Sequence, residues 1–405
     1  MGHSNSLLSK NNGHGAVKAG QIVLIFVIAS ALGFLFLYWL SHSVSPDYWP
    51  TGVDIYPRWV GTRAFWDNQS PYSPTVDLET QRLIYRRPAY PGEDSFGFYY
   101  PAYAAVVLAP LSLLPVEFAA ILWSSFMWGI LVTVVVSSTF LAPNRLSPIR
   151  WGLVLLAFFL YRPALLSVLN GQYAIYVAGC LILAWWMIRC ERYFLAGFLL
   201  SLSMIKPSLA LIPIMFVAVW SLLTKRAGIV LGMLCTLGAM LLLSFWKIGW
   251  WIPDFVQELG EYSRDLGTWT SRDFLSLPGI IWILSSILLI GLGCYEYRVR
   301  TKFPYALFFG GLLLNLAVTP HTLEYDLAIL ILPLLFLVPI LGRSALSYIY
   351  LLVLIWAPWI SWFAFTLAGA PIEVWWKAIW QFYPFLIACT LIITTVQELR
   401  STPRS

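Results

Sequence analysis

The chain has 405 residues, of which 60% are hydrophobic, 17% aromatic and only 11% charged. Soluble globular proteins do not have this composition, and many apolar runs are long enough to cross a bilayer, so we expect an all-α polytopic membrane protein. The formal net charge is +6, but no basic cluster is dense enough to indicate binding to nucleic acid.

The polar N-terminal segment, residues 1–20, carries Lys10 and Lys18 directly before the first apolar run. That run is too long for a signal-peptide core and lacks a convincing cleavage site, so we predict an uncleaved first span. The candidate apolar segments are 21–41, 101–115, 118–141, 151–168, 172–189, 193–205, 207–223, 228–248, 274–294, 304–319, 325–341, 345–366 and 375–396.

Basic residues cluster between these segments. The clusters are Lys10/Lys18, Arg145/Arg150, Arg189/Arg192, Lys225/Arg226, Arg298/Arg300/Lys302, Arg343 and Arg400/Arg404. The positive-inside rule places all of them in the cytoplasm if 101–115 does not fully cross and if 193–223 forms two short helices broken at Lys206-Pro207. In the alternative, 101–115 is a full span and 193–223 a single one, which puts two basic clusters outside. We favour the first arrangement.

The favoured arrangement has twelve crossings and both termini inside. It divides the chain into a cytoplasmic tail (1–20), one membrane domain (21–396) and a second cytoplasmic tail (397–405), with residues 42–100 as a long extracytoplasmic loop that carries amphipathic helices. The interruptions at 170–172, 206–207, 250–273 and 319–326 then fall on the same face as this loop. Broken helices at membrane depth are tolerated where they line a cavity, so we expect an outward-facing site.

Asp54 lies in "GVDIYPRWVG", just after the first span. An acid in this place gains nothing from lipid, so we favour a functional role for Asp54. Interface anchoring explains neighbouring aromatics such as Trp59 equally well. Lys206, among apolar residues and followed by a proline, either snorkels to the interface or lines a polar cavity.

Further polar residues of the same predicted face are candidate contacts, each with helix-end packing or snorkelling as the alternative explanation. They are Arg162, Gln172, His321, Asp326 and, in the loop, Tyr56, Arg58 and Tyr100. The chain has no usable phosphate-binding loop, HExxH or GxSxG motif, so a donor delivered from within the membrane fits better than a soluble nucleotide. The five cysteines form no CxxC pair, and no metal site is indicated.

Four stretches carry a family resemblance through their order and spacing. They are "GVDIYPRWVGTRAFWDNQSPY", "FGFYYPAYAAVVLAPLSLLP", the run from "NGQYAIYV" to "MIKPSLALIPI", and "TPHTLEYDLAILILPL". In this order they resemble glycosyltransferase family 87, the polyprenol-phosphate-sugar-dependent transferases of the GT-C superfamily. The stretch "SRDFLSLPG" at 271–279 departs from the pattern of many relatives, and this leaves the acceptor open.

The resemblance implies a GT-C fold in the cell membrane with extracytoplasmic chemistry. The partners would be a polyprenyl-phosphate sugar, mannose or in some members arabinofuranose, and a lipid or glycan acceptor, among membrane lipids. It implies that Asp54 is the base of an inverting transfer and that Lys206 and His321 contact the leaving phosphate. A divalent metal is possible, but no cofactor is required, because no second carboxylate is clearly paired with Asp54. The competing hypotheses are a lipid-linked-sugar flippase, a solute transporter and a non-enzymatic assembly subunit.

Overall fold

The computed structural model describes residues 6–43, 52–91, 93–141, 146–265, 277–300, 305–319, 323–342, 344–369 and 372–401. Within these ranges every regular element is a helix. In chain order the elements are α1 (Ser6–Ser43), α2 (Ile55–Trp66), α3 (Pro74–Tyr85), α4 (Ala104–Ser112), α5 (Val116–Leu141), α6 (Pro148–Phe159), α7 (Arg162–Leu169), α8 (Ala174–Arg189), α9 (Tyr193–Ser203), α10 (Pro207–Leu223), α11 (Gly228–Ile248), α12 (Ile252–Asp265), α14 (Leu277–Arg300), α15 (Tyr305–Val318), the 3₁₀ helix η1 (Glu324–Leu330), α16 (Ile331–Leu341), α17 (Ala345–Leu367) and α18 (Ile372–Ser401).

Seven helical stretches of the described chain are long and apolar enough to cross a membrane. They lie in α1, α5, α11, α14, η1 with α16, α17 and α18. An eighth candidate is the pair α6 and α7, which is bent by 46° at a short break. Four shorter apolar helices, α8, α9, α10 and α15, fall below the length of a full span. The protein is therefore a polytopic helical membrane protein, and the predicted number of twelve crossings stays a prediction.

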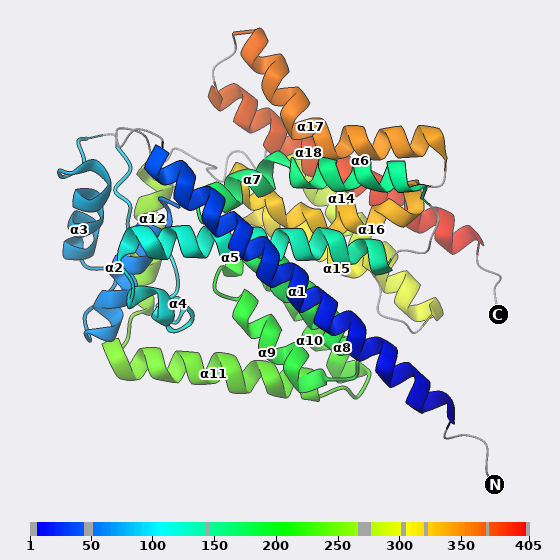
Figure 1. The fold of residues 1–405 in the computed structure, drawn as a ribbon, viewed down its shortest axis with the longest axis horizontal. Coiled ribbons are helices and arrows are strands. Elements are labelled where there is room, and N and C mark those ends of the chain that lie inside the picture. The colour runs from blue at the N-terminus through cyan, green and yellow to red at the C-terminus, as the bar shows by residue number, and fades with distance from the viewer. Residues whose placement is uncertain are drawn as a thin grey trace.

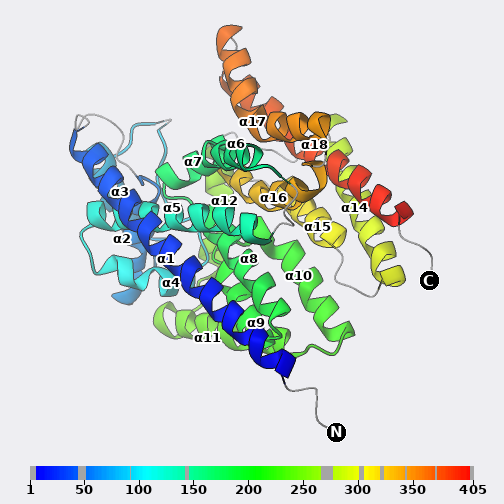
Figure 2. The ribbon, with the colours of Figure 1, turned by 45° about the vertical axis from the view of Figure 1, so that its right-hand side comes forward.

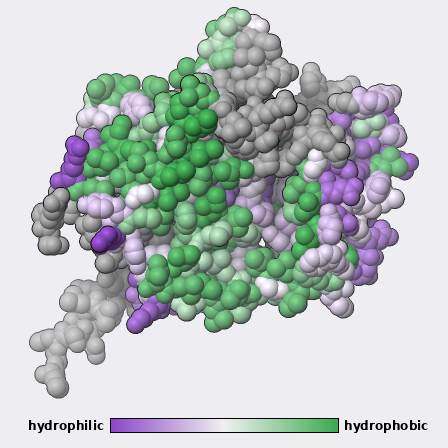
Figure 3. Space-filling model, turned by 180° about the vertical axis from the view of Figure 1, so that it is seen from behind, coloured by the Kyte–Doolittle hydropathy of each residue, from purple (hydrophilic) through white to green (hydrophobic). Residues whose placement is uncertain are grey.

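The long helices run side by side, and α2, α3, α4 and α12 gather at one end of them, which we call the loop face (Figure 1). Both chain ends lie away from the loop face (Figures 1 and 2). Seen from behind, apolar residues cover much of the middle of the surface, whereas polar residues gather at the edge that the loop face forms (Figure 3). Further polar residues lie at the opposite edge, and this distribution is typical of a lipid-embedded bundle whose two ends meet water.

Proline and helix length explain the interruptions of the apolar runs. α4 has nine residues, or about 13 Å at 1.5 Å per residue, which is far short of a hydrocarbon core of about 30 Å. The run 193–223 forms two helices, and Pro207 is the first residue of the second, where its missing N–H costs no hydrogen bond. Lys206 therefore sits at a helix break, where the sequence predicts one.

The loop face is packed protein and not a loose interfacial segment. Ten of the twelve residues of α2 are buried, and the helix packs against α3, α4 and α5. Trp59 is 8% exposed, and its indole N–H donates to the carbonyl of Leu114 at 2.9 Å. Trp59 is therefore packed inside the protein instead of anchoring at the lipid headgroups, one of the two roles that the sequence leaves open for it.

Candidate active site

Two glycine turns interlock where α2 begins. The N–H of Gly52 donates to the carbonyl of Leu169 at 2.7 Å, and the N–H of Asp54 donates to that of Asn170 at 3.1 Å. The φ angles of Gly52 and Gly171 are 71° and 74°, in the left-handed region that favours glycine. A Cβ on Gly171 would lie 3.4 Å from the Cα of Gly52. This close approach holds Asp54 beside the residue that follows Gly171.

Arg58 lies one helical turn after Asp54 and is fully buried. Its guanidinium donates to the carbonyl of Gly171 at 2.5 Å, to the hydroxyl of Tyr100 at 2.5 Å and to Gln172 Oε1 at 2.7 Å. It also lies 4.7 Å from the ring centre of Tyr100 and 4.2 Å from that of Tyr173. Arg58 therefore ties α2, the segment before α4 and the start of α8 into one unit.

Asp54 is half-buried, and its carboxylate accepts a hydrogen bond on Oδ2 from Gln172 Nε2 at 2.6 Å. Burial among the surrounding atoms raises the pKa of Asp54 above its ordinary value, while the charge of Arg58 and the hydrogen bond from Gln172 partly offset this rise. Smaller contributions to this pKa come from Asp94, which raises it, and from Lys206, which lowers it. Asp94 and Lys206 thus lie close enough for their charges to act on Asp54.

Lys206 forms an ion pair with the 3₁₀ helix η1. Its Nζ lies 2.5 Å from Oδ1 of Asp326, and the two side chains are 12% and 1% exposed. The other carboxylate oxygen of Asp326 accepts the backbone N–H of Leu323 at 3.1 Å, so Asp326 also caps η1. The ammonium lies 5.4 Å from the ring centre of Tyr325. Lys206 is consequently held in one position rather than snorkelling to the interface.

Arg162, at the start of α7, forms a second ion pair with η1. Its Nε lies 2.7 Å from Oε1 of Glu324, and its guanidinium packs on the rings of Trp359 and Trp362 of α17 at 5.0 and 4.9 Å. Glu324 and Asp326 can face different cations because residues two apart in a 3₁₀ helix point to different sides. η1 thereby connects the start of α7 to the start of α10.

The model of one family, Glycosyltransferase family 87, matches residues 98–323, which is more than half of the chain. The protein belongs to glycosyltransferase family 87. The matched segment contains Arg162, Gln172 and Lys206, whereas Asp54 and Arg58 precede it. No curated protein and no solved structure matches the chain. This family 87 protein is therefore a membrane glycosyltransferase, which needs a sugar donor and an acceptor.

The structure brings most of the predicted site residues of the family 87 enzyme together, with three exceptions. Tyr56 is buried, and its pKa is raised to about 12 by burial and by Glu117, away from the Asp54 cluster. Arg162 lies in its own ion pair with Glu324. His321 falls outside the described residues.

Sequence reasoning missed Glu324, Asp94 and Tyr262. Tyr262 belongs to α12, and its ring lies 4.2 Å from that of Tyr99. Burial raises the pKa of Tyr262 well above its ordinary value, and the charges of Asp94 and Asp54 add to this rise. α12 therefore covers the same site. The amphipathic pattern of 252–265 was the available signal, because such a helix needs a partner surface.

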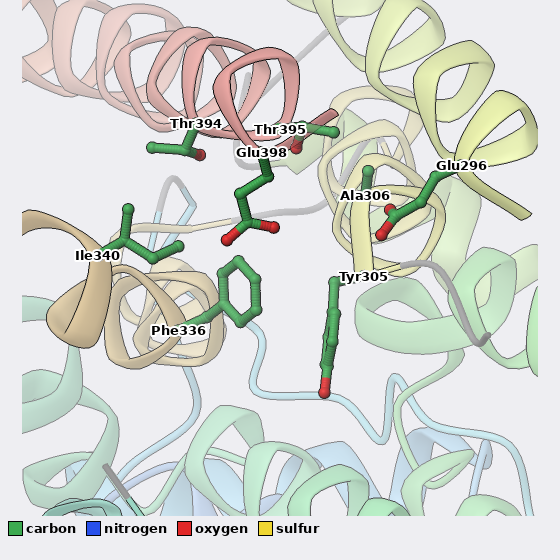
Figure 4. A pocket seen from close by; sticks show the side chains of 8 residues that line it. All are labelled: Glu296, Tyr305, Ala306, Phe336, Ile340, Thr394, Thr395 and Glu398. Atoms are coloured by element: carbon green, nitrogen blue, oxygen red, sulfur yellow. The ribbon is translucent and has the colours of Figure 1, made fainter. Parts of the chain in front are cut away.

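One crevice lies elsewhere in the molecule. Its lining includes Glu296, Tyr305 and Glu398, from α14, α15 and α18 (Figure 4). Tyr305 lies close enough to Arg189, the last residue of α8, for the charge of Arg189 to act on it. The candidate site lies at the other end of α8, beside its first turn. Sixteen residues of helix separate the two places by about 24 Å. The crevice is thus remote from Asp54. Among the described residues no group of three or more His, Cys, Asp or Glu is placed to hold a metal ion.

Proposed function

We propose that this family 87 enzyme moves a sugar, mannose in preference to arabinofuranose, from a polyprenyl phosphate to a hydroxyl of a lipid or glycan acceptor. Asp54 is the general base, and the reaction takes place at the loop face, on the extracytoplasmic side of the cell membrane. The observation that carries this proposal is Asp54 itself, a half-buried acid that has a raised pKa and stands near a fixed ammonium.

A raised pKa suits a base that works near neutral pH, because a stronger base takes a proton more readily as long as it is still ionised. Asp54 accepts the proton of the acceptor hydroxyl while the hydroxyl oxygen attacks the anomeric carbon. The bond from that carbon to the phosphate oxygen breaks, and the polyprenyl phosphate leaves with the electron pair. Attack from the side opposite the leaving group inverts the anomeric centre.

The leaving phosphate gains negative charge, and Lys206 is the cation placed to stabilise it. Its ammonium has three N–H donors, and Asp326 accepts one of them. Because the pair fixes the ammonium before substrate arrives, little reorganisation is needed when the charge develops. Arg162 is a second candidate contact, although Glu324 already balances its charge.

The path of the helices supports the proposed orientation. α8 starts just after Gln172 and ends at the basic residue Arg189. α10 starts just after Lys206 and ends close to the basic residue Arg226. Their lengths of 16 and 17 residues put those basic turns about 24–26 Å from the site. The positive-inside rule makes that far side cytoplasmic. If the bent pair and the four shorter helices also cross, the crossings reach the predicted twelve.

The decisive experiment uses the purified full-length enzyme in lipid nanodiscs with radiolabelled polyprenyl-phosphate mannose and a pool of membrane-lipid acceptors. The wild type should transfer label to an acceptor. Asp54→Asn keeps the shape of the side chain and an acceptor for Gln172, so it should fold normally. Its turnover should fall by about 10²–10⁴-fold, the usual contribution of a general base.

Two outcomes would contradict the proposal. Full transfer by Asp54→Asn would show that Asp54 is not the base. In liposomes, movement of intact donor between leaflets without any labelled acceptor would favour the flippase alternative. A polyprenyl-phosphate arabinofuranose donor, run in parallel, tests the preference for mannose.

A further inference from the structure

The charge of Arg58 is balanced in an uncommon way. A buried arginine normally faces a carboxylate. The hydrogen bonds that the structure describes for the Arg58 guanidinium instead end on neutral acceptors, namely the Gly171 carbonyl, the Tyr100 hydroxyl and the Gln172 amide oxygen. Nearby aromatic faces supply further stabilisation. The nearest described acid along this network is Asp54, and an amide stands between the two charges.

Both ends of the Gln172 amide are in use, and their chemistry fixes its orientation. Oε1 accepts from Arg58 Nη2 at 2.7 Å, and Nε2 donates to Asp54 Oδ2 at 2.6 Å. The reverse orientation would place two donors against each other at Arg58 and two acceptors against each other at Asp54. Gln172 is 3% exposed, so packing also restrains the side chain.

We infer that Gln172 is a positioning residue for Asp54, an amide spacer that passes the influence of the buried Arg58 charge to the carboxylate while keeping the two charges apart. This inference rests on the proposed function, in which Asp54 is the base. It replaces the sequence-based prediction that Gln172 contacts the donor.

The amide spacer lets Asp54 have a raised pKa, which makes it a stronger base, while the carboxylate stays ionised. A direct arginine fork would engage both carboxylate oxygens and depress the pKa of Asp54, leaving a weak base. Burial without any counter-charge would raise this pKa further and leave less of Asp54 ionised. One hydrogen bond on Oδ2, with Arg58 behind it, keeps the carboxylate ionised and aimed, and it leaves Oδ1 for an acceptor hydroxyl.

The test is the pH profile of kcat/KM for the acceptor in nanodiscs, because its acid limb reports the ionisation of the base in the free enzyme. Gln172→Leu removes the hydrogen bond to the ionised form of Asp54, so the acid limb should move up by about one to two pH units. Above the shifted limb the rate should recover towards that of the wild type, and the KM for the donor should not change.

Gln172→Glu is the second variant, and it provides a test if Gln172→Leu does not fold. It keeps the acceptor for Arg58 but sets a second carboxylate against Asp54, so the limb should move further upward. Gln69→Leu is the matched control, because Gln69 is an exposed glutamine of the same loop face and its profile should equal that of the wild type.

The outcomes separate the two proposals. If Asp54→Asn is inactive but the acid limb of the kcat/KM profile does not move in either Gln172 variant, Gln172 does not position Asp54. The assignment of Asp54 as the base then still holds. A loss of rate at every pH, together with a raised KM for the donor, would instead support the sequence-based prediction that Gln172 contacts the donor. Wild-type transfer by Asp54→Asn would overturn both proposals.

Discussion

The pair of Lys206 and Asp326 allows structural and chemical roles to be separated. Its atoms are 2.5 Å apart, and the side chains are 12% and 1% exposed. Lys206→Met removes the ammonium and leaves a buried carboxylate uncompensated, which should lower the free energy of unfolding by about 3–5 kcal/mol. The double variant with Asp326→Asn removes both charges and keeps an acceptor for the N–H of Leu323, so most of the stability should return.

Transfer should not return with stability, because the leaving phosphate then lacks its cation. We expect both variants to lose about 10²–10³-fold in turnover, the loss typical of one fixed electrostatic partner. Thermal denaturation and single-turnover transfer, both in nanodiscs, measure the two effects. Lys247→Met is the control, since Lys247 bonds the Trp66 carbonyl and the Asn68 side chain and should not affect chemistry. A double variant that regains transfer would mean that Lys206 is only structural.

Two further predictions concern the framework of the site and the orientation of the protein in the membrane. Gly171→Ala should reduce transfer and destabilise the fold by at least about 1–2 kcal/mol, because φ at Gly171 is 74°. Gly238→Ala is its control: its Cβ would meet nothing within 4 Å in the middle of α11, so it should stabilise the protein slightly, by about 0.5–1 kcal/mol. Gln69→Cys should react with an impermeant maleimide in intact cells, whereas the exposed native Cys190 should react only after permeabilisation. The reverse labelling pattern would invert the proposed orientation.

Much of the architecture could be predicted from the sequence because length, apolarity and proline act locally. The break at Lys206-Pro207 follows from the missing N–H of proline, and α4 is short because its apolar run is short. The packing of α2 could not be predicted in this way. Its mixture of aromatic and charged residues suits a lipid interface as well as a protein core, and only the helices around α2 decide between them.

The site shows a similar division between residue types and partners. Asp54, Gln172 and Lys206 could be selected one by one, because an acid, an amide and a lysine beside apolar segments each need an explanation. The contacts between these residues could not be predicted, because Asp54 and Gln172 are 118 positions apart and are brought together by two glycine turns. Glu324 was missed because the sequence does not show that Arg162 lies beside η1.

The 3₁₀ helix η1 holds two of the predicted cationic contacts, Lys206 and Arg162, in fixed positions through its carboxylates. A cation without such a partner at membrane depth would be costly and would shift towards water. Pairing reduces its net charge but fixes its place, and a donor phosphate that enters beside Lys206 adds a second anion to an ammonium that is already aimed. If Lys206 is the cation of the proposed reaction, Asp326 serves that reaction by holding Lys206 in place.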